Sequence, residues 1–175
     1  SGLPDAADVE PDGTFRLENV APGQYVSTLH MDSETHYVKS ARMGSQNLLE
    51  SDLNLTPGAD VRPIEIVVSP AGATVAGTVL NANNQPVTGA LVAIMRTSPP
   101  GFQWGSDCNH TGERGSFKFG RLAPGEYRVV AVERASELYC NDDDLLDKIR
   151  DAGERITLRE NERLTRELKI SRVRN

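Results

Sequence analysis

The chain has 175 residues, a length that suits one large domain or two small ones. Apolar residues make up 38% and aromatic residues 5%, which favours small β-rich modules over one large core. The formal net charge is −6, and the 25 acidic and 19 basic residues are mixed along the chain. Without a cluster of basic residues, no nucleic-acid partner is expected. No stretch approaches 18 apolar residues, so this segment is expected to make no membrane contact.

A repeated segment is the most informative feature of the sequence. PDGTFRLENVAPGQYVSTLHM occupies residues 11–31, and ERGSFKFGRLAPGEYRVVAVE occupies residues 113–133. A constant offset of 102 residues relates their landmarks, which indicates a duplicated structural unit. The landmarks of the first copy are Gly13, Phe15, Val20, Ala21, Pro22, Gly23 and Tyr25, and those of the second are Gly115, Phe117, Leu122, Ala123, Pro124, Gly125 and Tyr127.

Each copy predicts a β-hairpin in which a short strand with an inward Phe, an Ala-Pro-Gly turn and a longer strand follow one another. In the first copy the strands are expected near Thr14 and over residues 25–29, and a last strand is expected in IEIVVS, residues 64–69. The second copy has about 40 residues with two further strands before its hairpin. We therefore expect the first module to be incomplete at its N-terminus.

An open sheet edge in the first module would invite another chain to pair with it. A homodimer through this module is one expectation. The alternative is that the loop NLLESDLNL, residues 47–55, folds over the gap through its leucines.

The second module is predicted as a series of short strands. Residues 73–81 and 90–96 are rich in β-branched or apolar residues and are joined by the turn-forming ANNQPVTG. Residues 164–170 alternate apolar and polar side chains, which is typical of a strand. A single short helix is predicted over residues 141–153. The sequence thus predicts an all-β protein of two tandem Greek-key β-sandwich modules, residues 1–69 and 70–175.

The strings SPAGATVAGTVLNANNQPVTGALVAIM and GERGSFKFGRLAPGEYRVVAVE also carry a family resemblance. Residues 69–175 resemble the carboxypeptidase regulatory-like domain, a prealbumin-like (transthyretin-like) β-sandwich that often occurs in tandem in large extracytoplasmic proteins of bacteria. The resemblance implies an accessory module without catalytic residues, whose partners are other domains of the parent protein. Related folds sometimes bind starch-like sugars.

The two cysteines, Cys108 and Cys140, stand on opposite sides of the second predicted hairpin. Their numbers sum to 248, close to the value of about 247 expected for partners across a turn centred near residue 123.5. The sequence therefore favours a disulfide, which would indicate an extracytoplasmic location. Two unrelated buried thiols are the alternative.

Metal and catalytic sites are weakly indicated. Asp107 together with Asp142, Asp143 and Asp144 could hold calcium, or the three consecutive aspartates could simply begin a solvated helix. Cys108, His110 and Cys140 would lack a fourth zinc ligand. Glu34 and His36 are better explained as residues of a strand edge than as an acid–base pair. No nucleophile has a plausible base, so no enzyme activity and no cofactor are expected, and a hydrolase or a metal-dependent enzyme is the weakest hypothesis.

Phe102 and Trp104 lie after a Pro-Pro-Gly break in a loop, where they could stack on a sugar ring or a partner protein. Alternatively, Trp104 folds back and covers the core. The preferred function is a structural and interaction module of an extracytoplasmic protein. The second hypothesis is a carbohydrate-binding module that uses Trp104 and Phe102.

Overall fold

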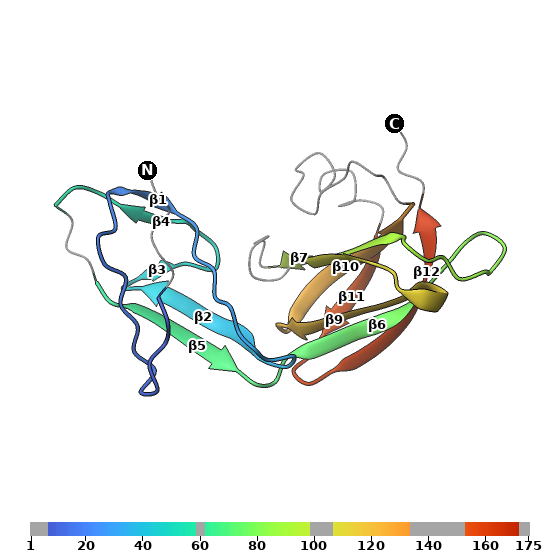
Figure 1. The fold of residues 1–175 in the computed structure, drawn as a ribbon, viewed down its shortest axis with the longest axis horizontal. Coiled ribbons are helices and arrows are strands. Elements are labelled where there is room, and N and C mark those ends of the chain that lie inside the picture. The colour runs from blue at the N-terminus through green and yellow to red at the C-terminus, as the bar shows by residue number, and fades with distance from the viewer. Residues whose placement is uncertain (1–6, 59–61, 99–106, 134–152, 172–175) are drawn as a thin grey trace.

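The computed structural model describes residues 7–58, 62–98, 107–133 and 153–171 (Figure 1). Within these residues the regular structure is β-strand, apart from one 3-10 turn at Glu113–Gly115. The all-β prediction is therefore confirmed. Residues 141–152 of the predicted helix lie outside the described residues.

The N-terminal part contains five strands in two small sheets, on the left of Figure 1. In one sheet β1 (Gly23–Tyr25) pairs with β4 (Leu53–Leu55), and both strands are short. In the other, β2 (Tyr37–Met43) lies between β3 (Gln46–Asn47) and β5 (Ile64–Ser69). All these pairings are antiparallel, and the strand predicted at residues 64–69 is confirmed.

The loop NLLESDLNL contributes to the core of the N-terminal part. Leu48 and Leu53 are buried in one cluster with residues of β2, and Leu49 and Leu55 pack against it while partly buried. The leucines of this loop thus pack in the core, whereas their covering a gap left by missing strands stays a prediction. The homodimer stays a prediction.

The C-terminal part contains seven strands in one continuous network of hydrogen-bonded pairs, on the right of Figure 1. Its order is β8-β7-β10-β12-β6-β9, and β11 pairs with β10. The bounds are β6 (Ala73–Leu80), β7 (Leu91–Ser98), β8 (Asp107–His110), β9 (Ser116–Leu122), β10 (Gly125–Val132), β11 (Glu154–Leu158) and β12 (Arg163–Ser171). The strands predicted within residues 73–81, 90–96 and 164–170 are confirmed, and β10 is the longer strand expected after the second Ala-Pro-Gly turn.

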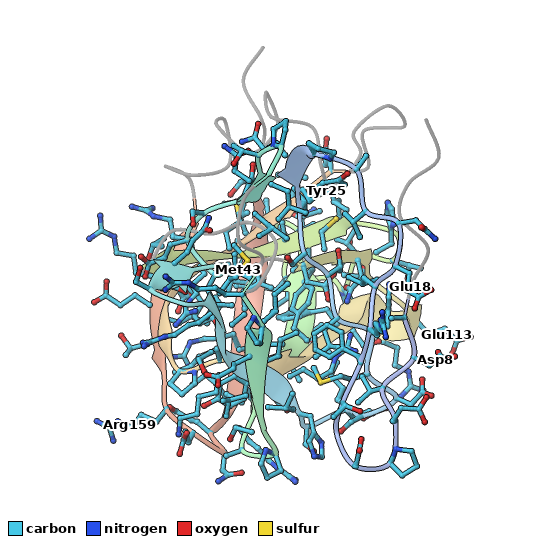
Figure 2. All side chains as sticks on the ribbon, turned by 90° about the vertical axis from the view of Figure 1, so that its left-hand side faces the viewer. Asp8, Glu18, Tyr25, Met43, Glu113 and Arg159 are labelled. Atoms are coloured by element: carbon cyan, nitrogen blue, oxygen red, sulfur yellow. The ribbon has the colours of Figure 1, made fainter. Side chains whose placement is uncertain are left out.

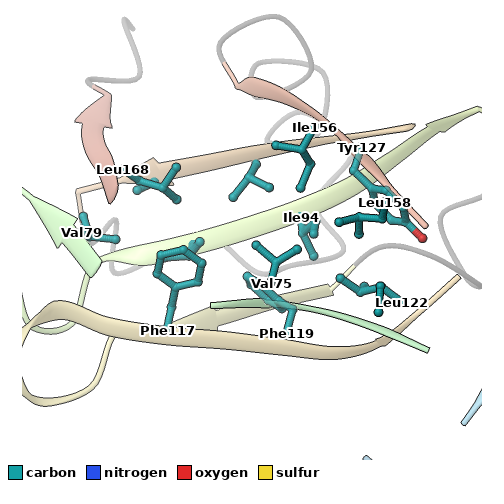
Figure 3. Packing of buried hydrophobic residues seen from close by; sticks show 14 of the residues in the cluster. Val75, Val79, Ile94, Phe117, Phe119, Leu122, Tyr127, Ile156, Leu158 and Leu168 are labelled. Carbon is teal, nitrogen blue, oxygen red and sulfur yellow. The ribbon is translucent and has the colours of Figure 1, made fainter. Parts of the chain in front are cut away.

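The main core lies between the layers of this part and is filled by alternate residues of the strands (Figure 3). On β10, Tyr127 and Val129 point into this core. Val130 and Val132 belong to a second cluster, together with Leu91, Ala93 and Met95 of β7. Both faces of β10 are therefore buried. This double burial explains why the returning strand of the second copy is almost wholly apolar.

The predicted hairpin of the second copy is wrong. β9 pairs with β6, whereas β10 lies beside β7, β11 and β12. Arg121, the next-to-last residue of β9, is in the left-handed region (φ 58°), and Gly125, the first residue of β10, has φ 153°. Because the two strands pair with different neighbours, the chain crosses between layers here instead of folding back on itself. A turn between two layers and a hairpin turn use the same residue types, because Pro and Gly permit both. The register argument for the cysteines depended on the hairpin and falls with it.

The hairpin of the first copy is also wrong. Residues 14–18 form no strand, Phe15 is only half-buried, and β1 ends at Tyr25 instead of continuing to Leu29. A strand this short has few partners, and β4 provides three paired positions for it. The predicted equivalence of Phe15 and Phe117 as core residues therefore fails, since only Phe117 is buried in a core cluster.

The repeat itself is reproduced in backbone geometry at its turns. Gly13 and Gly115, at the offset of 102, both have positive φ, 85° and 70°. Asn19 and Arg121, also at this offset, have φ of 57° and 58°. Equivalent turns are closed by equivalent backbone bonds, from Glu10 N to Thr14 O at 2.8 Å and from Gly112 N to Ser116 O at 2.9 Å. The duplicated sequence therefore encodes duplicated turns, even though the strands around them differ.

Strand pairing divides along the chain near Pro70. Every strand pairing described joins residues within 23–69 or within 73–171, and the three core clusters follow the same division. Charged side chains, such as those of Asp8, Glu18, Glu113 and Arg159, lie on the periphery (Figure 2). The independent folding of modules 1–69 and 70–175 stays a prediction.

Candidate functional site: the junction between the two parts

The two parts meet where β5 leads into β6 through Ser69-Pro70-Ala71-Gly72 (Figure 1). Residues 31–39 of the N-terminal part contact three short segments of the C-terminal part, at residues 72, 118–121 and 160. We call this set of contacts the junction. It is the candidate functional site, because it contains hydrogen bonds and ion pairs between the two parts.

Two glycines allow the backbones to approach at the junction. The N–H of Gly72 donates to the carbonyl oxygen of Thr35 at 2.8 Å, and a Cβ at Gly72 would lie 2.3 Å from that same oxygen. A Cβ at Gly120 would lie 2.9 Å from the carbonyl oxygen of Glu34. Both distances are shorter than real Cβ contacts, so a larger residue at either position would push the two parts apart.

A buried tyrosine is the centre of the polar contacts. Tyr37, at the start of β2, is only 5% exposed, and its Oη donates to Glu160 Oε1 at 2.9 Å. Burial, followed by this hydrogen bond to a carboxylate, raises the pKa of the Tyr37 phenol above its ordinary value. Lys39 Nζ lies 3.6 Å from the same Glu160 oxygen. Glu160 therefore accepts a hydrogen bond from Tyr37 and forms an ion pair with Lys39 across the junction.

A second ion pair crosses the junction at the surface. Lys118 Nζ on β9 donates to Glu34 Oε2 at 2.7 Å. The hydrogen bond from Lys118, and then its positive charge, hold the pKa of the Glu34 carboxyl below its ordinary value. Both side chains are largely exposed, at 58% for Lys118 and 84% for Glu34, so solvent screens the pair. This pair contributes to alignment more than to stability.

The chemistry of the junction is that of a structural contact. Glu34 pairs with Lys118, whereas His36 Nδ1 lies within hydrogen-bonding distance of Ser33 Oγ. The structure thus pairs the two members of the considered acid–base couple with other residues. The expectation that neither is a catalytic residue stays a prediction.

Most of the site residues predicted from sequence lie outside the described residues. These are Phe102, Trp104, Cys140, Asp142, Asp143 and Asp144. Asp107 lies at the start of β8, where its Oδ1 accepts a hydrogen bond from the N–H of Cys108 at 2.8 Å. Cys108 is opposite Ala93 of β7 and packs against the second cluster. The disulfide, the calcium site and the aromatic binding loop stay predictions.

Within the part of the chain that the structure describes, no group of three or more His, Cys, Asp or Glu side chains is arranged to hold a metal ion. The described residues also contain no helix with the length and apolar character needed to cross a membrane.

Sequence reasoning found the place of the junction but not its contacts. The short Ser69-to-Gly72 connection signals that two modules adjoin with hardly any linker. Thr35, Tyr37 and Glu160 carry no motif, because each is an ordinary residue until the fold brings it against the other part. Gly72 and Gly120 are the only local signals, since glycine commonly marks close backbone approach.

No protein-family model and no curated protein matches the chain. Among solved structures, it is similar to the pilus 2b backbone protein of group B streptococcus, with 14% identity and a TM-score of 0.39 over 66% of this chain and 46% of that one. It is also similar to the major pilin subunit of Bacillus cereus, with 9% identity and a TM-score of 0.40 over 78% of this chain and 56% of that one. The chain thus spans about half the length of these two proteins.

A third similar structure is the dioxygenase domain of a dioxygenase carbohydrate-binding protein fusion from Streptomyces sp. SirexAA-E. The identity is 20% and the TM-score 0.33, over 58% of this chain and 81% of that one. At these identities and TM-scores none of the three likenesses supports an inference about function.

Proposed function

We propose that the chain is a non-catalytic structural and interaction module, a spacer and docking surface within a larger extracytoplasmic protein. The observation that carries the proposal is the junction. Backbone bonding at Gly72, the buried contact between Tyr37 and Glu160 and the pair of Lys118 with Glu34 hold the two β parts in one arrangement. A spacer needs such a contact, since a flexible connection would not transmit orientation from one end to the other.

The extracytoplasmic location and the family belong to the same proposal. The predicted Cys108–Cys140 disulfide would persist outside the reducing cytosol, and the resemblance to the carboxypeptidase regulatory-like domain implies an accessory module of this kind. The expected partners are the other domains of the parent protein. No cofactor is required for this function.

Residual dipolar couplings test the rigid junction directly. The backbone N–H couplings of residues 23–69 and of residues 73–171 should fit one shared alignment tensor, because both parts tumble as one body. Two tensors of clearly different magnitude would show that the parts move independently and would refute the spacer proposal.

A pair of glycine variants provides the matched control. Gly72→Ala should separate the two tensors, because the new Cβ would lie 2.3 Å from the Thr35 oxygen. Gly23→Ala should leave one tensor, since its Cβ would make only an ordinary contact of 3.5 Å with the Tyr25 ring. Retention of a shared tensor in Gly72→Ala would show that close approach at this position is not what couples the parts.

Carbohydrate binding is tested separately. If Phe102 and Trp104 form a sugar-binding face, migration in a polysaccharide-containing gel should be retarded, and Trp104→Ala should abolish the retardation. Migration unaffected by every polysaccharide would remove this alternative. Metal analysis of the purified protein tests the hypothesis of a metal-dependent enzyme, and a protein without bound metal would remove it.

A further inference from the structure

The first and last described strands of the C-terminal part are neighbours and run in the same direction. β6 and β12 pair in parallel, with seven residue pairs from Arg163 opposite Thr74 to Lys169 opposite Leu80. In Figure 1 they lie side by side along the lower edge of this part. Because they are parallel, the start of β6 and the end of β12 lie at opposite ends of the pair.

β6 lies inside the sheet, and the end of β12 is joined to a second strand. β6 also pairs antiparallel with β9, and the end of β12 pairs in parallel with the end of β10. β6 therefore has a hydrogen-bonded neighbour on both sides. Among the described strands, residues 163–169 of β12 pair with β6 alone, and only Ile170 and Ser171 pair with β10.

The pair is also closely packed. A Cβ at Gly77 would lie 1.7 Å from the carbonyl oxygen of Arg166, so the two backbones approach there as only glycine permits. Val75, Val79 and Leu168 from the two strands are at most 4% exposed and share the main core. Sliding one strand along the other would break the ladder and disturb the core together.

Further backbone bonds extend the ladder at the entry to β6. The N–H of Thr74 donates to Glu162 O, and the N–H of Asn161 donates to Ala71 O, both at 2.8 Å. These bonds tie the connection from β5 to the turn before β12. Tension that reaches β6 from the N-terminal part meets them first.

Tension along the chain would load this pair in shear. It would pull β6 from its start, through Gly72 and β5, and β12 from its end at Ser171. The two forces run along the strands in opposite directions and across the hydrogen bonds, so the bonds of the ladder share the load. In an antiparallel hairpin the two free ends lie together, and the bonds open one at a time.

We propose that the β6–β12 pair is a mechanical clamp, which resists unfolding of the C-terminal part when the protein is under tension. This inference rests on the proposed spacer function, because only a chain that joins other parts end to end carries tension. The N-terminal part has no parallel strand pair among its described residues, and its first ladder, β1 with β4, has three pairs. The N-terminal part should therefore unfold before the clamp opens.

Single-molecule pulling of the intact chain tests the clamp. With handles at the two chain ends and reductant present, the C-terminal part should unfold last. Its unfolding is identified by the release of residues 73–171, at roughly 3.3–3.6 Å for each residue. The matched control moves one handle from the N-terminus to Asn83, an exposed turn residue after β6, and keeps the other at the C-terminus.

The control leaves the fold unchanged but places both loaded ends at the same end of the β6–β12 pair. The unfolding force of the C-terminal part should fall by about twofold or more, because the bonds then open in sequence. Equal forces in the two geometries, or unfolding of the C-terminal part before the N-terminal part, would overturn the clamp. The dipolar couplings report on the rigid junction independently, so failure of the clamp and failure of the spacer are distinguishable.

Discussion

Tyr127 Oη donates a hydrogen bond to the carbonyl oxygen of Ala123, four residues earlier in the chain, at 2.7 Å. The first copy of the repeat makes the same bond, from Tyr25 Oη to Ala21 O, also at 2.7 Å. In both copies the tyrosine reaches back over the Pro-Gly turn and closes it. The duplicated Ala-Pro-Gly-x-Tyr sequence thus forms the same closed turn in both copies, whether the strand that follows is short or long.

The two copies of this bond should differ in their energetic value. Tyr127 is 1% exposed and Ala123 is 4% exposed, whereas the bond of Tyr25 is at the surface. Tyr127→Phe should therefore lower the free energy of unfolding by about 1–3 kcal/mol, since a buried carbonyl loses its partner. Tyr25→Phe should cost less, because water can replace the hydroxyl. Urea denaturation of both variants measures the difference, and equal losses would contradict this account.

Alkaline titration should detect the raised pKa of Tyr127. Burial raises the pKa of Tyr127 to about 12, whereas the unfolded chain ionises near 10. The stabilisation from keeping this phenol protonated is therefore fully present below pH 10 and is lost as the pH rises towards 12. Tyrosinate absorbance should show a late phase that Tyr127→Phe removes. Complete ionisation near pH 10 in a protein that is still folded by circular dichroism would argue against it.

Phe117 and Phe15 provide a second comparison between the copies. Phe117→Ala should lower the free energy of unfolding by about 3–5 kcal/mol, because its ring is 5% exposed in the main core and its loss leaves a cavity. Phe15→Ala should have a much smaller effect, since Phe15 is half-buried outside regular structure. An unchanged denaturation midpoint for Phe117→Ala would mean that this ring does not stabilise the core.

Gly77 should be intolerant of any side chain. In Gly77→Ala the new methyl group would meet the Arg166 carbonyl oxygen at 1.7 Å and the Phe117 ring at 3.0 Å, so β12 would have to move. We expect a loss of about 1–3 kcal/mol in thermal or urea denaturation. Gly23→Ala is the control, with only ordinary contacts at 3.5 Å, and similar losses in both variants would point to a general glycine effect instead.

The disulfide between Cys108 and Cys140 remains open to a direct test. Without reductant, intact-mass spectrometry should show the protein two hydrogens lighter than its reduced form. By the chain-entropy model, a closed loop of about thirty residues would contribute roughly 3–4 kcal/mol of stability. Two reactive thiols in the oxidised preparation would instead support unrelated cysteines, and the argument for an extracytoplasmic location would lose its chemical basis.

The sequence by itself determined the local features of this protein. The repeat at an offset of 102 and the strand character of residues 73–81 and 164–170 were predicted, and the structure adds that the landmark glycines Gly13 and Gly115 both have positive φ. Each depends on a few neighbouring residues, through the conformational freedom of glycine or the alternation of apolar side chains. These features can be recognised within one segment of the sequence, because no distant residue is needed to produce them.

Only the tertiary structure decided which strands pair. The segments around Ala123-Pro124-Gly125 have the sequence of a hairpin, yet β9 pairs with β6 and β10 with β7, because strand–turn–strand patterning is the same for both connections. The contacts of the junction could not be predicted for a similar reason. Tyr37 and Glu160 are 123 residues apart, and nothing local in either residue specifies the other. Pairing and contact are set by burial of the whole core, which no single segment encodes.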